Sequence, residues 1–482
     1  MDFMNYARPA QNGSLPEVGP EVGIGDIVEH PRYGRGQVAA IYRNGTEWMV
    51  RFESNLRFRR PRHEFHGQQE KPMLLSQQLA PVFTPMSHTQ FEARQVIEAL
   101  RMGIAPARHI QELTIGLVDA RGKLLGGLNQ AHQRGGSAFA LVGDYGYGKS
   151  HIVELVTQDA LARNFLVATI SLDLAELPAH RAFDIYAALT RSMRYPDSDE
   201  PGLTTLLTKA GALPGLVEQL HDLSPVTHDP LAVTLAALGN ISSTRQRAAW
   251  IAWLMGGRRV KAMNRTMPGG TKFPSIYANG NNARQITYLL SGLSVLARLV
   301  GYSGLCVLID EAESYSLLSA AQRLKAEQFF SALLAATQGE QTQINTEKLP
   351  QHRWRDYPLR YTDRQSLFFL FTMTRSDNRM PLDTWLAPEQ IIELDSQHTP
   401  REVGNFLQQV LTYHTLAYAY GAGERQGQVR RGAAEHLAQG LHNDRLSMRG
   451  VVRLAVELFD LLYLYPDYDT ANLLDEVRSQ MR

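Results

Sequence analysis

Five short apolar runs, separated by longer helical patterns, mark the hydrophobic pattern between residues 136 and 395. They read SAFALVG from residue 137, FLVATISL from 165, LCVLID from 305, SLFFLFTM from 366 and QIIELD from 390. Strands that alternate with helices form parallel sheets covered on both faces. The pattern therefore predicts an α/β fold built around a parallel sheet of five strands.

A separate β-rich pattern occupies residues 23–65. The runs QVAAIY and EWMVRF flank Asn44-Gly45, and an Asn-Gly pair between two such runs is a strong hairpin signal. About forty residues suffice for a small β-barrel with a thin core. A polar tail at 1–22 precedes this predicted barrel, and a linker at 66–90 that is rich in Gln, Pro and Ser follows it.

The remaining chain divides into two predicted parts. Residues 91–397 contain the five strand runs and form the predicted core, with a mostly helical insert at about 175–300. From residue 398 to 482 the pattern is helical throughout, which predicts a helical lid or a winged-helix-like region. The length of 482 residues fits two to four domains of roughly 100–200 residues each.

The composition excludes several classes of protein. The formal net charge of +1 gives no global attraction to nucleic acid or to membranes, so any such contact needs a local patch. The single cysteine, Cys306, rules out a disulfide within the chain and fits a reducing compartment. No apolar run reaches the ~18 residues of a membrane span, and the N-terminus lacks a signal-peptide pattern. We therefore expect a cytoplasmic protein without membrane contact.

The first strand run leads into a glycine-rich turn that fits the pattern G-x-x-x-x-G-K-[ST]. Its residues are Gly143, Asp144, Tyr145, Gly146, Tyr147, Gly148, Lys149 and Ser150, and His151 follows on the predicted helix. Glycines let backbone N–H groups surround phosphate oxygens, and the helix start adds the positive end of its dipole. Lys149 can reach the β- and γ-phosphates, and Ser150 can ligate Mg²⁺. We therefore predict that residues 143–151 bind ATP.

The third strand run ends in two carboxylates, Asp310 and Glu311. Open α/β sheets bind ligands at the carboxyl ends of their strands. Asp310 is the candidate ligand for Mg²⁺, and Glu311 is the candidate base that orients and polarises the attacking water. The alternative is a strand end capped by solvated acids. Glu313 is a less specific candidate, because a charge near a helix start also explains it.

Candidate sensors of the γ-phosphate follow the fourth strand run and also lie in the C-terminal helices. Thr374 ends the segment FTMT and is the first candidate, with Thr372 behind it. Arg375 and Arg379 follow, and either is a candidate arginine finger for a neighbouring subunit or a solvated loop residue. Arg449 begins the helical pattern of SMRGVVRLAVELF, where a lid residue can reach the γ-phosphate or form a surface salt bridge.

The order of these elements resembles the AAA+ and related P-loop ATPases that have an added catalytic glutamate. More narrowly, VIEALRMGIAP, GDYGYGKSH, LARLVGYSGLCVLIDEAE and SMRGVVRLAVELFDLL are similar to the ATP-binding proteins of bacterial BREX-type phage-defence loci, the BrxD-like group. The resemblance covers roughly residues 90–482. It implies a cytoplasmic ATPase that works with defence partners, among them a helicase or a DNA methyltransferase.

The N-terminal segment GDIVEHPRYGRGQVAAI is similar to the small Tudor-like barrels of some superfamily 1 helicases and of CarD-type transcription factors. Those barrels bind RNA polymerase or other proteins, and sometimes nucleic acid. The residues expected to be exposed for contact with DNA or a partner are His30, Tyr33, Trp48, Phe52, Arg57, Arg59, Arg60 and Arg62. Arginines between aromatic residues suit phosphate contacts with stacking, but the aromatics can instead form the small core.

A second basic stretch, residues 256–274, lies in the predicted insert. Its cations are Arg258, Arg259, Lys261, Arg265 and Lys272, with no acidic residue between them. The stretch either contacts a DNA backbone, with an affinity that falls as salt rises, or forms a solvated loop.

The sequence as a whole predicts a Mg²⁺- and ATP-dependent ATPase that is recruited to DNA or to a DNA-processing partner in anti-phage defence. Two alternatives stay open. The first is an ATP-gated scaffold with low turnover that controls the assembly of a defence complex. The second is an oligomeric DNA translocase. A homo-oligomer that depends on ATP, with an arginine finger from a neighbouring subunit, would support the translocase, whereas turnover by monomers, or no turnover, would favour the scaffold.

Overall fold

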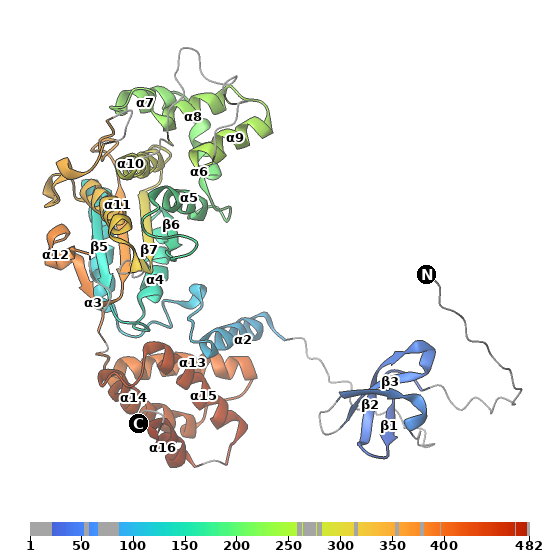
Figure 1. Cartoon of the computed structure of the whole chain (residues 1–482). Coiled ribbons are helices and arrows are strands. Elements are labelled where there is room, and N and C mark those ends of the chain that lie inside the picture. The colour runs from blue at the N-terminus through green and yellow to red at the C-terminus, as the bar shows by residue number, and fades with distance from the viewer. Residues whose placement is uncertain are drawn as a thin grey trace, which may run out of the picture. The chain divides into compact units, whose positions relative to one another are not determined.

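The computed structural model describes residues 22–52, 57–65, 86–257, 263, 276, 282–312, 317–351, 356–375, 380–395, 397–467 and 469–479. The chain divides into two compact units, Met1–Met86 and Ser87–Arg482. Figure 1 shows the helices and strands of both.

The first unit contains a four-stranded antiparallel sheet in the order β1-β2-β3-β4. Its strands are β1 (Ile27–His30), β2 (Gly34–Tyr42), β3 (Glu47–Phe52) and β4 (Arg57–Pro61). β2 and β3 form the predicted hairpin around Asn44-Gly45, whose φ angles are 53° and 90°. Asn and Gly tolerate this left-handed backbone better than other residues, so the chain reverses here.

The inward face of this N-terminal sheet carries a small core. It consists of Val28, Val38, Trp48, Val50, Phe52 and Phe65. We expected His30, Trp48 and Phe52 to be exposed, and that expectation is wrong, because they are 8%, 4% and 2% exposed. A unit of this size buries little surface, so its large aromatic side chains are needed in the interior.

The second unit is built around a parallel sheet in the order β6-β7-β8-β5-β9. Its strands are β5 (Gly136–Val142), β6 (Phe165–Ser171), β7 (Gly304–Asp310), β8 (Leu367–Met373) and β9 (Ile391–Glu393). Each predicted run forms one of these strands, so the predicted α/β fold class is confirmed. β8 separates β5, which leads into the glycine-rich turn, from β7, which ends in the carboxylates.

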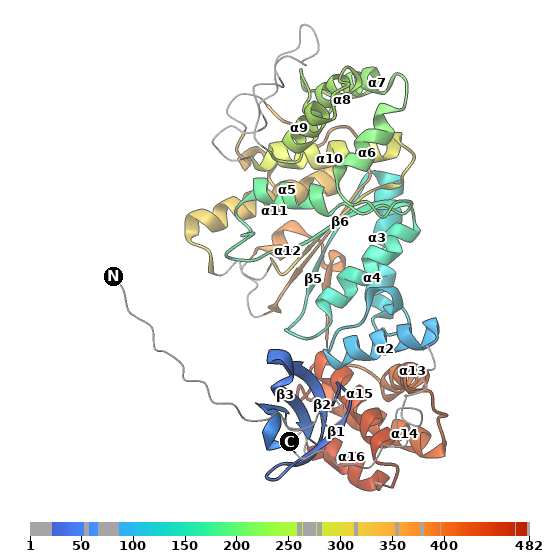
Figure 2. The same ribbon diagram turned by 90° about the vertical axis from the view of Figure 1, so that its right-hand side faces the viewer.

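Helices cover both faces of this sheet (Figure 2). On one face pack α3 (Val118–Arg134) and α4 (Lys149–Ala162). On the other face pack α5 (Ala182–Ser192), α10 (Ala283–Leu299) and α11 (Ala320–Gln338). α12 (Leu382–Trp385) is a short helix between β8 and β9.

The side chains of β7 show why the strand runs are apolar throughout. Cys306 and Leu308 belong to the core that includes α3 and α4, whereas Val307 and Ile309 belong to the core that includes α10 and α11. Successive side chains of a strand point to opposite faces, and both faces are buried here. The strands therefore lack the alternation of polar and apolar residues that is typical of a strand with one face in solvent.

Between β6 and β7 the chain forms a helical segment in the range expected for the insert. Besides α5 and α10 it contains α6 (Leu203–Gly211), α7 (Leu216–Leu223), α8 (Pro230–Gly239) and α9 (Thr244–Leu254). Figure 1 places α6 to α9 at the end of the sheet opposite to the C-terminal helices. This segment therefore lies away from the edge that carries the glycine-rich turn.

The C-terminal region is helical, as predicted. It comprises α13 (Pro400–Tyr418), α14 (Glu424–His442), α15 (Met448–Leu464) and α16 (Thr470–Ser479). The described residues after 397 contain no strand, so the helical expectation holds and the winged-helix alternative does not. Among the helices that the structure describes, none is long and apolar enough to cross a membrane.

α2 (His88–Arg101) packs against this lid, on α13 and α15. The Nη2 atom of Arg101 donates hydrogen bonds to both carboxylate oxygens of Asp460, at 3.0 and 2.8 Å. Arg94 donates to the carbonyl oxygen of Ala417. The chain then reaches α3 through residues 102–117, so α2 begins the second unit on the lid side.

Candidate functional site

The phosphate loop connects β5 to α4 at the carboxyl edge of the sheet. Gly146 and Gly148 have φ angles of 87° and 89°, which only glycine adopts without strain. The Nζ atom of Lys149 donates to the carbonyl oxygens of Gly143 and Asp144, at 2.9 and 3.2 Å, and Lys149 is only 7% exposed. The loop is thus curled around the ammonium group, with the first turn of α4 directly behind it.

Asp310 is fixed at the end of β7 by the neighbouring strand. The hydroxyl of Thr372, on β8, donates to its Oδ1 atom, and the backbone N–H of Glu311 donates to the same atom at 3.0 Å. Asp310 is 9% exposed and Thr372 is fully buried. Thr372, which the sequence placed behind Thr374, therefore orients the candidate metal ligand.

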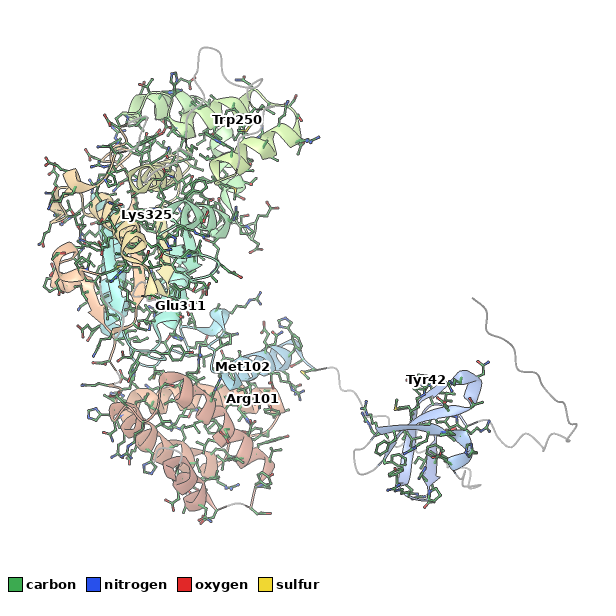
Figure 3. All side chains as sticks on the ribbon, viewed as in Figure 1. Tyr42, Arg101, Met102, Trp250, Glu311 and Lys325 are labelled. Carbon is green, nitrogen blue, oxygen red and sulfur yellow. The ribbon has the colours of Figure 1, made fainter. Side chains whose placement is uncertain are left out.

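Glu311 is exposed at the same edge and has a φ angle of 55°, which is unusual for a residue other than glycine. Its Oε2 atom accepts a hydrogen bond of 2.6 Å from the hydroxyl of Ser171, at the end of β6. Figure 3 labels Glu311 at the edge of the sheet that faces the lid. This backbone conformation and the bond to Ser171 together set the direction of the carboxylate.

A cavity of about 480 Å³ lies beside the phosphate loop, within the size range of small-molecule sites. Its polar lining includes Lys149, Ser150, Glu311 and Arg449. Its apolar lining consists of Ile104, Ala105, Pro106, Ile110, Leu113, Ile115, Leu117, Met448 and Val452. The cavity therefore offers polar groups suited to phosphates and apolar surface suited to a base.

Sequence reasoning missed the apolar wall formed by residues 103–117. This segment has apolar residues without a helical period, it is interrupted by Pro106, and it lies between two helices. An irregular apolar segment between two helical patterns, ahead of the phosphate loop in the chain, was the available signal.

His151, on the first turn of α4, faces this wall. Its Nε2 atom lies 2.8 Å from the hydroxyl of Thr114. Burial lowers the pKa of His151 to about 4, so the imidazole is neutral at pH 7. His151 lines the cavity, and its bond to Thr114 ties α4 to the apolar wall.

The lid contacts the phosphate loop at three adjacent residues. The Nη1 atom of Arg449 donates to the phenol oxygen of Tyr145 at 2.8 Å, and the backbone N–H of Met448 donates to the carbonyl oxygen of Gly146 at 3.2 Å. The hydroxyl of Tyr147 donates to Asp444. The structure thus brings Arg449 to the cavity, at the start of α15.

Other predicted residues lie elsewhere or outside the described residues. Thr374 is half-buried after β8 and does not line the cavity. Arg375 is exposed and pairs with Glu393, with 3.3 Å between Nη2 and Oε2. Glu313 and Arg379 lie outside the residues that the structure describes.

The donor set fits a Mg²⁺ ion that is shared with phosphate oxygens. Ser150 and Asp310 offer oxygen atoms, the ligands that Mg²⁺ prefers, and Mg²⁺ is usually held by one or two carboxylates with substrate phosphates. Among the described residues, no group of three or more His, Cys, Asp or Glu side chains is placed to hold a metal. The described side chains at this edge of the sheet therefore do not by themselves form a complete coordination sphere for a metal ion.

Two of the four arginines predicted to contact DNA or a partner, Arg59 and Arg60, lie in ion pairs. Arg59 bonds to Glu47, with 2.6 Å between Nη2 and Oε2. Arg60 lies 3.9 Å from Glu64, and the guanidinium of Arg62 lies 5.4 Å from the ring centre of Trp48. Arg57 is exposed. The second basic stretch, with Arg258, Arg259, Lys261, Arg265 and Lys272, lies outside the described part of the chain.

The strand order and the phosphate loop define an AAA+-like P-loop fold with a helical lid. Residues 89–210, which contain the phosphate loop, match the family model of the BREX system ATP-binding protein BrxC/D. This match confirms the family resemblance over residues 89–210, which is part of the range for which the sequence predicted it.

One solved structure, titled "Structure of Drosophila ORC bound to DNA", is similar with a TM-score of 0.32 and 14% sequence identity. The similarity covers 80% of this chain and 69% of that chain. No curated protein matches the chain.

Proposed function

We propose that the protein binds ATP with Mg²⁺ in the cavity beside the phosphate loop and hydrolyses it. The observation that supports this most directly is the meeting of three parts of the chain around one cavity. Lys149 comes from the phosphate loop, Glu311 from the end of β7 and Arg449 from the lid. In this proposal the ATPase serves anti-phage defence and associates with DNA or with a DNA-processing partner, such as a helicase or methyltransferase.

Binding begins at the phosphate loop. Lys149 exchanges its bonds to the carbonyl oxygens of Gly143 and Asp144 for the β- and γ-phosphate oxygens, because an anionic oxygen is the stronger acceptor. The backbone N–H groups at the start of α4 hold the remaining phosphate charge. The base then lies against the apolar wall of residues 103–117, where its contact removes apolar surface from water.

Hydrolysis depends on the carboxylate of Glu311. It accepts the proton of the attacking water and orients that water towards the γ-phosphorus. Ser150 and Asp310 would hold the Mg²⁺ ion, which neutralises charge that develops on the phosphate oxygens. Thr372 and the N–H of Glu311 keep Asp310 in position for this role. Thr374 directly follows β8 and does not line the cavity, so it has no part in this mechanism.

The lid reads the nucleotide state through Arg449. Before ATP binds, its guanidinium donates to the neutral phenol oxygen of Tyr145. A γ-phosphate is a stronger acceptor and draws Arg449 into the cavity. The start of α15 follows Arg449, and the lid returns when the γ-phosphate leaves.

The bond between Ser171 and Glu311 favours one alternative, an ATP-gated scaffold with low turnover. While Oε2 of Glu311 accepts from Ser171 at 2.6 Å, this oxygen is less available as a base. In the scaffold, ATP binding alone would set the lid position, and hydrolysis would only reset it.

Glu311→Gln separates binding from hydrolysis. The amide keeps the size of the side chain and loses the base, so we expect ATP affinity to persist while the hydrolysis rate falls by roughly 10²-fold or more. Steady-state phosphate release and titration with a fluorescent ATP analogue measure the two quantities. Full turnover by this variant would remove Glu311 from the proposed mechanism.

Ser171→Ala is the matched test of the scaffold alternative. A higher rate in this variant would mean that Ser171 restrains the base, as low turnover requires. A lower rate would mean that Ser171 positions Glu311 for catalysis.

A further inference from the structure

The segment that contains the N-terminal sheet carries a local excess of positive charge. Residues 22–65 contain eight arginines and no lysine, against five Asp or Glu residues. The formal net charge of all 482 residues is only +1. A local excess of positive charge produces a local field even when the net charge is close to zero.

Two of these arginines are directly opposite each other in the sheet. Arg51 on β3 pairs with Arg57 on β4, and both side chains are exposed on the outward face. Like charges at directly opposite positions destabilise a pair of strands. Within residues 22–52 and 57–65, the ion pairs involve Arg43, Arg59 and Arg60 but neither Arg51 nor Arg57.

The other arginines of the basic run are already engaged. Arg59 bonds to Glu47, and its guanidinium lies 4.3 Å from the ring centre of Tyr42, a residue labelled in Figure 3. The guanidinium of Arg62 covers Trp48 in the same way. The rings of Trp48 and Phe52 are buried, and Tyr42, at 39% exposed, has the Arg59 guanidinium over its ring. What Arg51 and Arg57 offer a ligand is charge.

We propose that the outward face of β3 and β4, at Arg51 and Arg57, binds the phosphodiester backbone of double-stranded DNA without reading its sequence. The proposal deepens the association with DNA named above and rests on that part of the proposed function. Guanidinium groups bind phosphate oxygens through two parallel hydrogen bonds. A phosphate between the two arginines removes the repulsion that the sheet register imposes on them.

The test uses the full-length protein without nucleotide and a fluorescent duplex of about 30 base pairs in anisotropy titrations between about 50 and 200 mM salt. The variant Arg51→Gln/Arg57→Gln removes the arginine pair. The control Arg32→Gln/Arg43→Gln removes the same charge from the two turns that flank β2. Because each lost phosphate contact lowers the salt slope by about 0.9, we expect the slope to fall by about two for the first variant. Its affinity at low salt should fall about tenfold or more, and the control should change by about twofold or less.

Two further measurements keep the result interpretable. Loss of the like-charge contact predicts that the Arg51→Gln/Arg57→Gln variant is at least as stable as the wild type, so its unfolding temperature should not drop. Its basal ATP hydrolysis should equal that of the wild type, because neither residue belongs to the cavity.

Equal losses in both double variants would overturn the proposed face, because charge alone would then explain the binding. DNA binding that survives the loss of the arginine pair would also overturn it, and would leave the face to a protein partner. A wild-type protein that does not bind the duplex at low salt would remove DNA from the proposed function as well. ATP hydrolysis is tested by a separate assay. A failure of the DNA-binding proposal can therefore be distinguished from a failure of the proposed ATPase activity.

Discussion

His151 makes the stability of the folded protein sensitive to acid. It is neutral in the folded protein because burial lowers its pKa to about 4, whereas an unfolded histidine titrates near 6.5. Between these values the unfolded chain binds more protons than the folded one. The free energy of unfolding therefore falls as the pH is lowered from about 6.5 to about 4, by on the order of 3 kcal/mol in total.

Urea unfolding at about pH 7 and pH 5 measures this loss, with His151→Gln as the comparison. Glutamine keeps a polar partner for Thr114 and does not titrate, so we expect a smaller loss in the variant. Asp229, whose pKa burial raises to about 6, acts in the opposite direction but contributes equally to both proteins. Identical losses in wild type and variant would show that His151 is not the group responsible.

An ion pair with a buried carboxylate joins α4, which follows the phosphate loop, to α3. Arg121 on α3 donates to both carboxylate oxygens of Asp159 on α4, each at 2.7 Å, and Asp159 is 3% exposed. Arg121→Ala leaves that carboxylate buried without its main partner, and we expect the free energy of unfolding to fall by about 3 kcal/mol. Denaturant titration measures it.

Arg163→Ala is the matched control for this pair. Its Nη1 atom lies 3.9 Å from the same carboxylate, so its removal should cost less than about 1 kcal/mol. If the free energy of unfolding falls by the same amount in both variants, the two short hydrogen bonds of Arg121 do not make it the more stabilising partner of Asp159.

The elements that the sequence predicted are those with a local signal. The strands could be predicted because β7 and its neighbours are buried on both faces, and the turn at Asn44-Gly45 because few residues accept its backbone. The burial of Trp48 depends on how four strands close over a thin core, which no single run reveals.

The candidate site also has parts with a local sequence signal and parts that arise only in the folded chain. The phosphate loop and the Asp310–Glu311 pair lie in contiguous segments, so the sequence could point to them. The apolar wall of residues 103–117 and the bond between Ser171 and Glu311 arise from segments that meet only in the fold. The roles proposed for these residues remain predictions until the variants are measured.

At the scale of the whole molecule, the position of the lid should depend on Arg449. Arg449→Ala keeps the phosphate loop intact, so we expect ADP to bind normally while the ATP-specific conformation is lost. X-ray scattering and protease protection in ATP and in ADP measure the difference. Arg453 is the control, because it lies one turn further along α15 and donates to the carbonyl oxygen of Met102. Profiles of the Arg449 variant that still separate ATP from ADP would contradict the proposal.

The attachment of α2 to the lid has a mechanical consequence. Tension on DNA held by the N-terminal sheet would enter the second unit at Ser87, directly before α2. α2 is anchored to α15 through Arg101 and Asp460, and the start of α15 is bonded to Gly146 in the phosphate loop. A pull on the DNA would therefore load the contact between α15 and the phosphate loop before it loads the sheet, and the rate of nucleotide release would depend on force.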